Sequence, residues 1–261
     1  MIKCKYPIIF VCSFLAILLY GCGRSLPEEG ERADQPLMIF AAASLTDVMQ
    51  EIVQEFEKTT GEHVYLNFAG TNTLRLQIEK GSPAQVLISA DEYNVRTLID
   101  KGFVRPEFHS PFAGNRLVVI CPRGRPFTLN RFEDLPLVIS SHLSLADPDT
   151  VPAGIYAKEA MHNAGGWEKL QRYIAPAVDV RAALAQVEMA NADGGIVYHT
   201  DAVLSKRVNI VLDVPQKFHR PIYYYKCLLG SHPCALADSF YRFLDSEIAK
   251  SILEKYGFIL L

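Results

Sequence analysis

The sequence lacks several features that would assign it at once to a class of protein. Its 26 Lys and Arg are balanced by 29 Asp and Glu, so there is no basic surplus to suggest a nucleic-acid partner. It has no internal repeat, no low-complexity tract and no cluster among its 15 prolines. A Walker A motif, a dinucleotide fingerprint and zinc-ligand spacing are also missing. With 261 residues, 49% of them hydrophobic, the chain can still bury one or two cores.

Cysteine is scarce in the part of the chain that we expect to fold. The six cysteines are Cys4, Cys12, Cys22, Cys121, Cys227 and Cys234. Cys4 and Cys12 lie in a predicted signal peptide, and Cys22 ends it. Cys227 and Cys234 flank the turn-like segment LLGSHP, so a disulfide between them is one prediction and two buried free thiols are the other. Three remaining cysteines with scattered histidines do not form a metal-ligand pattern.

Residues 1–22 have the layout of a signal peptide. Two lysines precede an apolar stretch that is too short and too close to the N-terminus to favour a membrane-spanning helix. The stretch ends in LYGC, which resembles a bacterial lipobox, so we predict that Cys22 is lipidated and begins the mature protein. An ordinary secretory signal cleaved nearby is the alternative. In both cases the mature protein works outside the cytoplasm, and residues 23–36 form a flexible polar tether.

From residue 37 onward, short apolar runs alternate with helical patterns. The run LMIFAAAS predicts a buried strand, and Leu45–Lys58 has the apolar face of a helix. Two further pairs follow, with strands in HVYLNFAG and AQVLISA and helices in TNTLRLQIEK and DEYNVRTLIDKG. This alternation predicts an α/β fold with a parallel sheet and helices on both faces.

The rhythm changes around residues 111–126, where a β run is bracketed by proline and glycine. A second α/β series follows, and the C-terminal segment returns to the first. We therefore predict two lobes, with lobe I formed by 37–113 plus 219–261 and lobe II by 114–218. Two crossings make a hinge. A cleft between the lobes would face the carboxyl ends of strands from both sheets, where open α/β sheets bind ligands.

Several separated motifs then resemble one family, the molybdate-binding proteins that serve bacterial ABC importers. The resemblance covers about residues 37–258. Its segments occur in the family's order: FAAASLTD, FAGTNTLRLQIEKGSPAQVLISAD, GNRLVV, DPDTVPAGIYAKEA, DVRAALAQVE, GIVYHTDA and YGF. It implies a two-lobed periplasmic-binding-protein fold of type II, with the ligand held in the cleft between the lobes.

The resemblance also implies which residues hold the anion, through hydroxyl and backbone N–H donors and without a counter-charge. Ser44 matches the first hydroxyl ligand, and Thr71 stands where the family commonly has a serine. Ala153 and Val180 match the positions that donate a backbone N–H, and Tyr198 matches a phenolic donor.

Local patterns alone explain these residues in a simpler way. Ser44 with Asp47 three residues later resembles a capping box, Thr71 is a plausible helix cap, and Tyr198 ends a β run as a buried core tyrosine would. Jointly, however, they place several helix N-termini from both lobes at one cleft. Unpaired N–H groups and partial positive charge at those ends make an anion site without arginine.

The resulting hypothesis is an extracytoplasmic solute-binding protein, not an enzyme, that captures molybdate or tungstate by lobe closure. As a monomer held at the membrane by its lipid anchor, it would deliver the anion to an ABC permease driven by a cytoplasmic ATPase. No cofactor is expected besides the anion itself. A site made only of donors should reject phosphate, because an unpaired P–O–H group costs about 1–3 kcal/mol. Rejection of sulfate must come from cavity size.

Other functions also fit parts of the sequence. A sulfate or thiosulfate receptor on the same scaffold is the first alternative. A ferric-ion receptor would use tyrosines, but the three in YYY at 223–225 alternate between strand faces. Ser44, His199 and Asp201 could supply a hydrolase triad, although AAASL lacks the glycines of a nucleophile elbow. A purely adhesive surface lipoprotein is the last alternative.

Overall fold

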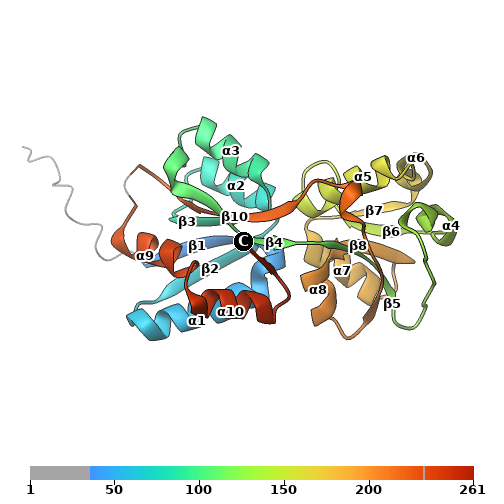
Figure 1. Cartoon of the computed structure of the whole chain (residues 1–261). Coiled ribbons are helices and arrows are strands. Elements are labelled where there is room, and N and C mark those ends of the chain that lie inside the picture. Colours follow the sequence, from blue (N-terminus) through green and yellow to red (C-terminus); the bar gives the residue numbers. More distant parts are fainter. Residues whose placement is uncertain (1–35, 232) are drawn as a thin grey trace, which may run out of the picture. The chain divides into compact units, whose positions relative to one another are not determined.

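The computed structural model describes residues 36–231 and 233–261. The predicted signal peptide, Cys22 and residues 23–35 of the predicted tether lie outside these ranges. Within them the chain forms two mixed β-sheets flanked by helices, so the α/β prediction is confirmed (Figure 1). No helix in the described ranges is long and apolar enough to cross a membrane.

The first sheet has six strands in the order β11-β4-β10-β3-β1-β2. Their bounds are β1 Leu37–Ala42, β2 Val64–Ala69, β3 Val86–Ser89, β4 His109–Asn115, β10 Ile222–Leu228 and β11 Ile259–Leu260. Strand β1 pairs in parallel with β2 and β3, as the strand–helix alternation predicts. Strand β10 is antiparallel to both β3 and β4. The C-terminal part of the chain therefore completes the sheet that the N-terminal part begins.

Helices cover both faces of this sheet. Figure 1 shows α2 and α3 over one face and α1 and α10 over the other. The bounds are η1 Ala43–Leu45, α1 Thr46–Thr60, α2 Thr71–Glu79, α3 Glu92–Asp100, η2 Pro106–Phe108, α9 Ala235–Phe243 and α10 Glu247–Lys255. Side chains of β1 alternate between the two faces of the sheet: Ile39 and Ala41 belong to one hydrophobic cluster, and Phe40 belongs to the other.

The second sheet has five strands in the order β7-β6-β8-β5-β9. Their bounds are β5 Leu117–Pro122, β6 Leu143–Ala146, β7 Ile174–Ala177, β8 Gly194–Tyr198 and β9 Val208–Asp213. Strand β6 is parallel to β7 and β8, whereas β5 is antiparallel to β8 and β9. The helical segments are η3 Phe132–Asp134, α4 Leu135–Val138, α5 Pro152–Asn163, α6 Trp167–Leu170, η4 Gln171–Tyr173, α7 Val180–Glu188, α8 His199–Leu204 and η5 Gln216–Phe218.

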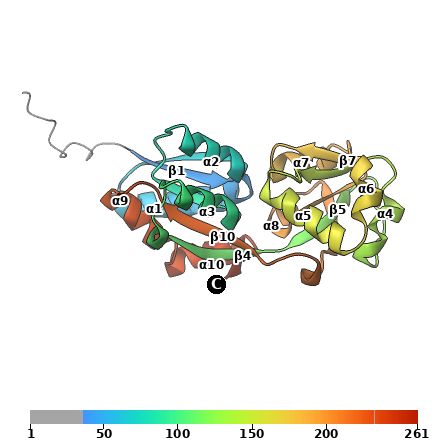
Figure 2. The same ribbon diagram turned by 90° about the horizontal axis from the view of Figure 1, so that it is seen from above.

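Two segments connect the sheets, and Figure 2 shows both (β4 leading out and the stretch before β10 leading back). Strand β4 ends at Asn115 and β5 begins at Leu117. The predicted lobe boundary falls between residues 113 and 114, and β4 runs past it because Asn115 still pairs with Ile222 of β10. We use lobe I for the elements around the first sheet and lobe II for those around the second.

Helices α2, α7 and α8 each begin within a few residues of the end of a strand. Helix α2 follows β2 after Gly70, α7 follows β7 by two residues, and α8 follows β8 without a break. The predicted helix 45–58 is α1, which ends at Thr60 because Gly61 adopts a left-handed φ of 75°. Helix starts therefore gather at the carboxyl ends of parallel strands in both lobes.

The predicted disulfide between Cys227 and Cys234 is not formed, since both thiols are free. Cys227 lies in β10 and is buried in the hydrophobic cluster beneath α2 and α3. Cys234 packs against the other, larger cluster. The alternative of two buried free thiols is correct in that both are free, but only Cys227 is buried, because Cys234 is partly exposed.

Gly154 should tolerate no side chain. A Cβ at this position would overlap the carbonyl oxygen of Ala146 and lie 2.5 Å from that of Asp147, because the start of α5 packs against the end of β6. We expect Gly154→Ala to lower the free energy of unfolding by about 1–3 kcal/mol, measured by denaturant titration. Gly124→Ala is the control, since its Cβ would meet no atom within 4 Å. Equal stability of the two variants would contradict this packing.

Candidate anion-binding site

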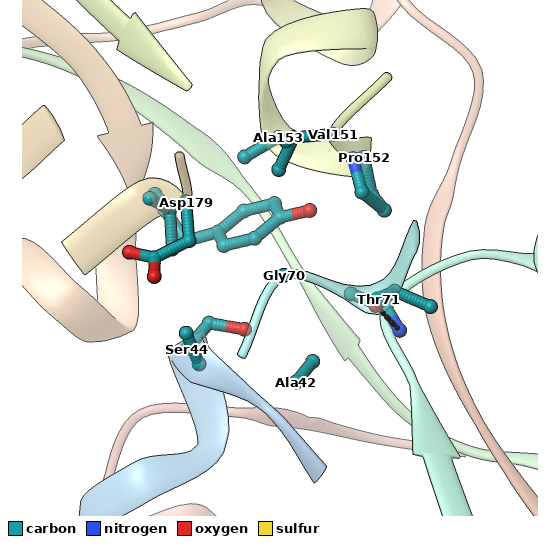
Figure 3. Close-up of a pocket in the computed structure, with 12 residues that line it drawn as sticks. Ala42, Ser44, Gly70, Thr71, Val151, Pro152, Ala153 and Asp179 are labelled. Carbon is teal, nitrogen blue, oxygen red and sulfur yellow. Dashed lines mark hydrogen bonds between the residues drawn. The ribbon is translucent and has the colours of Figure 1, made fainter. Parts of the chain in front are cut away.

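One pocket contains all five residues that the resemblance implicates. The space is about 210 Å³, including its opening to solvent. The lining residues are Ala42, Ala43, Ser44, Gly70, Thr71, Ala90, Val151, Pro152, Ala153, Asp179, Val180 and Tyr198 (Figure 3). The pocket is thus lined by segments of both lobes and has room for a small ligand only.

Five of the lining residues are helix N-caps. Ala42 precedes η1, Gly70 precedes α2, Val151 precedes α5, Asp179 precedes α7 and Tyr198 precedes α8. Four of these caps make no side-chain hydrogen bond to their helix. Sequence reasoning identified helix starts near the site, but it did not show that their caps leave the first N–H groups without a side-chain acceptor.

Helices α2, α5 and α7 each begin at the pocket. They contain 9, 12 and 9 residues, and each N-terminus carries roughly half a positive charge. Pro152 has no N–H, so the Ala153 N–H is the first donor of α5. Asp179 accepts a hydrogen bond from the Ala182 N–H at 2.8 Å and so caps α7 in the ordinary way. This hydrogen bond does not involve the N–H of Val180, which also lines the pocket.

Small residues let backbone atoms approach the ligand and each other. Ala42, Ala43, Ala90 and Ala153 place only methyl groups at the pocket wall. A Cβ on Gly70 of lobe I would lie 3.0 Å from the carbonyl oxygen of Val178 in lobe II, so the two lobes meet closely here. The run of alanines before Ser44 therefore serves access to the backbone as well as packing.

The two hydroxyl groups at the site already have donors pointed at their oxygens. Thr71 Oγ1 accepts a hydrogen bond from the Ala90 N–H at 3.1 Å, and Ser44 Oγ accepts one from Tyr224 Oη at 2.9 Å. In Figure 3 the Ser44 oxygen points into the space between the labelled residues. Because each oxygen accepts from the protein, its own proton is available to a ligand.

Tyr198 places a buried hydroxyl without a hydrogen-bond partner among the described residues at the pocket. Its side chain as a whole is buried. Burial raises the pKa of Tyr198 well above its usual value of 10, so the phenol remains a proton donor at neutral pH. An unsatisfied buried hydroxyl costs about 1–3 kcal/mol, and a bound acceptor would remove that cost.

Positive side chains stay away from the pocket wall. None of the described residues that line it is Lys or Arg. The guanidinium of Arg181, next to Val180, instead contacts two carboxylates, with 2.5 Å from Nη2 to Asp47 Oδ2 and 2.5 Å from Nε to Asp201 Oδ1. Asp47 belongs to α1 of lobe I and Arg181 to α7 of lobe II, so this ion pair joins the lobes.

Asp201 is the buried member of this cluster. It is fully buried, and burial raises its pKa to about 7 despite the attraction of Arg181. Sequence reasoning missed the cluster, although its members stand inside the recognised motifs. Asp47 and Asp201 each follow a site residue by three positions, which is a signal that could have suggested a shared partner.

The residues considered for a hydrolase triad are not assembled into one. Ser44 Oγ is bonded to Tyr224, and Asp201 pairs with Arg181. His199 faces Gly257 instead, where an added Cβ would lie 3.5 Å from the histidine Nδ1. Among the described residues, these three side chains therefore form no nucleophile–base pair with one another.

Comparisons with known proteins agree with this geometry. Residues 37–259 match the family model described as bacterial extracellular solute-binding protein. The molybdate-binding protein ModA of Escherichia coli K12 is 40% identical over 240 residues, covering 90% of this chain and 91% of that protein. YvgL of Bacillus subtilis, whose name describes an ABC transporter substrate-binding lipoprotein, is 33% identical over 257 residues, covering 97% and 98%.

A solved structure supports the fold. The periplasmic molybdate-binding protein of Azotobacter vinelandii superposes with a TM-score of 0.77 at 23% sequence identity, covering 86% of this chain and 99% of that one. At that identity the likeness shows the architecture and not the ligand. The predicted two-lobed, periplasmic-binding-protein type of fold is confirmed by it.

Removing the Tyr198 hydroxyl should separate stability from binding. We expect Tyr198→Phe to keep or slightly raise the unfolding midpoint without ligand, because a buried unsatisfied donor disappears. Affinity for an oxyanion should fall about 10- to 100-fold, since the hydroxyl would donate to a charged acceptor. Calorimetric titration with molybdate measures the second effect. Tyr93→Phe, at an exposed tyrosine, is the control; a destabilised Tyr198→Phe protein with unchanged affinity would contradict the assignment.

The ion pair between the lobes should favour the closed form modestly. Asp47→Asn removes the lobe I partner of Arg181, whose pair with Asp201 remains within lobe II. Because Asp47 is 41% exposed, we expect an effect below about 1 kcal/mol, or up to fivefold weaker anion binding with faster release. Stopped-flow dissociation is the measurement. The control is Asp238→Asn, whose partner Arg242 lies on the same helix; equal release rates for both variants would contradict this role.

Proposed function

This chain belongs to the bacterial extracellular solute-binding proteins, in the branch of the molybdate-binding proteins, and from that premise we propose that it captures molybdate or tungstate in the pocket between its lobes. The observation that carries the proposal is the convergence of hydrogen-bond donors on one pocket. Five helix starts, two hydroxyls whose oxygens already accept hydrogen bonds and one buried phenol without a partner among the described residues surround a single small space.

The donor set explains how a doubly charged anion can be held without a counter-charge. Each oxygen of molybdate is an acceptor at neutral pH, and each group proposed to bind it is a donor. Ser44 and Thr71 would donate from lobe I. Ala153, Val180 and Tyr198 would donate from lobe II. Such a ligand draws the lobes together because it binds the closed arrangement best.

The same chemistry supports selectivity against phosphate. Phosphate keeps a proton at neutral pH and would need an acceptor inside the pocket. The carboxylate of Asp179 caps α7 through the Ala182 N–H, and one acceptor site on each hydroxyl oxygen is taken by Tyr224 or Ala90. A P–O–H group would therefore compete for few acceptors, and leaving it unpaired would cost about 1–3 kcal/mol. Sulfate has no such proton, so its rejection depends on the size of the pocket.

Delivery and location follow from the family. Its members are the substrate-binding components of ABC transporters, so a membrane permease with its cytoplasmic ATPase is the partner that we propose for the loaded protein. We further propose that the mature protein is a monomer held at an extracytoplasmic membrane surface by lipid on Cys22, and the name of the Bacillus subtilis relative supports the anchor. No cofactor is needed for capture and release.

A sulfate or thiosulfate receptor on the same scaffold is the alternative function. It shares the need for a site made only of donors, so the hydrogen bonds do not exclude it. The difference would lie in pocket size, where the methyl group of Thr71 occupies space beside the hydroxyl.

Thermal unfolding of residues 23–261 with different oxyanions tests the proposal. With free molybdate or tungstate at about a thousand times its dissociation constant, binding adds roughly 4 kcal/mol. The midpoint should then rise by about 8–16 °C, and Ser44→Ala should reduce the shift. Phosphate should give no shift. A shift with sulfate alone would instead establish the alternative receptor, and no shift with any oxyanion would refute both.

A further inference from the structure

Tyr224 connects the hinge strands to the anion site. It is the middle residue of the YYY run in β10 and is fully buried, whereas its neighbour Tyr223 is 37% exposed. Its Oη lies 2.9 Å from Ser44 Oγ and 3.2 Å from Nδ2 of Asn115, the last residue of β4. Side chains alternate along β10, which argues against a shared ferric site for the three tyrosines and directs Tyr224 inward.

The direction of this hydrogen-bond chain is fixed by a backbone group. The Arg116 N–H, which can only donate, lies 2.9 Å from Asn115 Oδ1. That contact identifies the amide oxygen and leaves Nδ2 as the donor to Tyr224 Oη and to Thr200 Oγ1, the latter at 2.9 Å. Since Tyr224 Oη accepts from Asn115, its proton goes to Ser44 Oγ, and the Ser44 proton is left for the pocket.

We propose that Tyr224 is a specificity-determining positioning residue, which occupies one of the two acceptor sites on Ser44 Oγ, favours donation of the Ser44 proton to the ligand and so selects against protonated oxyanions. This inference rests on the proposed function and deepens it. Without the Tyr224 hydroxyl, both acceptor sites on Ser44 Oγ would be open to the P–O–H group of phosphate. With it, one of these sites is occupied, and the hydrogen bond that Ser44 accepts strengthens its own O–H as a donor to the ligand.

Tyr224 is well placed to keep this direction. Its ring makes edge-to-face contacts with Tyr198 and Phe258, at centroid distances of 6.0 and 5.4 Å. Burial raises the pKa of Tyr224 far above its usual value of 10, so the phenol keeps the proton that it donates. The ring cannot swing aside without losing these contacts and its two hydrogen bonds.

Ser44 depends on a side chain for its direction, and Thr71 does not. Thr71 Oγ1 accepts from the backbone N–H of Ala90, which no substitution at that residue other than proline removes. Ser44 Oγ accepts from Tyr224, which a single substitution can change. Of the two groups that donate to these hydroxyl oxygens, Tyr224 is therefore the one whose substitution should change the selectivity between oxyanions.

The test compares Tyr224→Phe with wild type by calorimetric titration with molybdate and with inorganic phosphate. We expect molybdate affinity to fall about 2- to 10-fold, because one oriented hydrogen bond loses its support. Phosphate affinity should fall less or rise, so the molybdate-to-phosphate ratio of affinities should narrow by about tenfold. Tyr223→Phe, the same change at the exposed neighbour, should leave the ratio unchanged.

A double-mutant cycle distinguishes positioning from a general packing role. In a Ser44→Ala background, Tyr224→Phe should have no further effect on the affinity ratio, because the group through which it acts is absent. If Tyr224→Phe does not fold, Asn115→Leu acts one hydrogen bond earlier and should narrow the ratio in the same way.

Each outcome has a distinct meaning. A wild-type protein that binds no oxyanion overturns the proposed function and this inference together. A wild-type protein that binds molybdate, with an unchanged ratio in Tyr224→Phe or with additive effects in the cycle, overturns this inference alone.

Discussion

A dianion enclosed between two lobes exchanges its hydration for protein donors, and that exchange constrains the rest of the structure. Donors must be numerous, already oriented and close together, because each unpaired oxygen or N–H in a dry site is expensive. Helix N-termini meet this need, since their first N–H groups have no partner within the helix. The fold brings five helix starts to one space of about 210 Å³, and four of their caps leave those groups without a side-chain acceptor.

The sheet topology makes that convergence possible. Parallel strands end at one edge of each sheet, and the helices that follow them begin there. Strand β10 runs the opposite way beside β4, so Tyr224 reaches Ser44 from the hinge and not from the helix layer. Ligand donors and hinge strands are thus in direct contact, which gives lobe closure and donor orientation a common structural basis.

Sequence patterns predicted the parts that depend on local order. Strand–helix alternation gave the fold class, and the motifs around Ser44 and Tyr198 pointed to one site. Contacts between distant segments were beyond such patterns: Tyr224 and Ser44 are separated by 180 residues, and Arg181 and Asp47 by 134. The disulfide prediction failed for the same reason, because proximity in sequence does not reveal which hydrophobic cluster each thiol joins.

Charged side chains are arranged so that no Lys or Arg lines the described part of the pocket. Arg181 lies beside Val180, yet its guanidinium is taken by Asp47 and Asp201 and does not line the pocket. A guanidinium facing the ligand would attract any anion, protonated or not, and would weaken selection by hydrogen-bond direction. Because the guanidinium contacts carboxylates on other elements, the described pocket wall offers helix N–H groups and hydroxyls but no positively charged side chain. Recognition of an anion there depends on the direction in which these neutral donors point their protons.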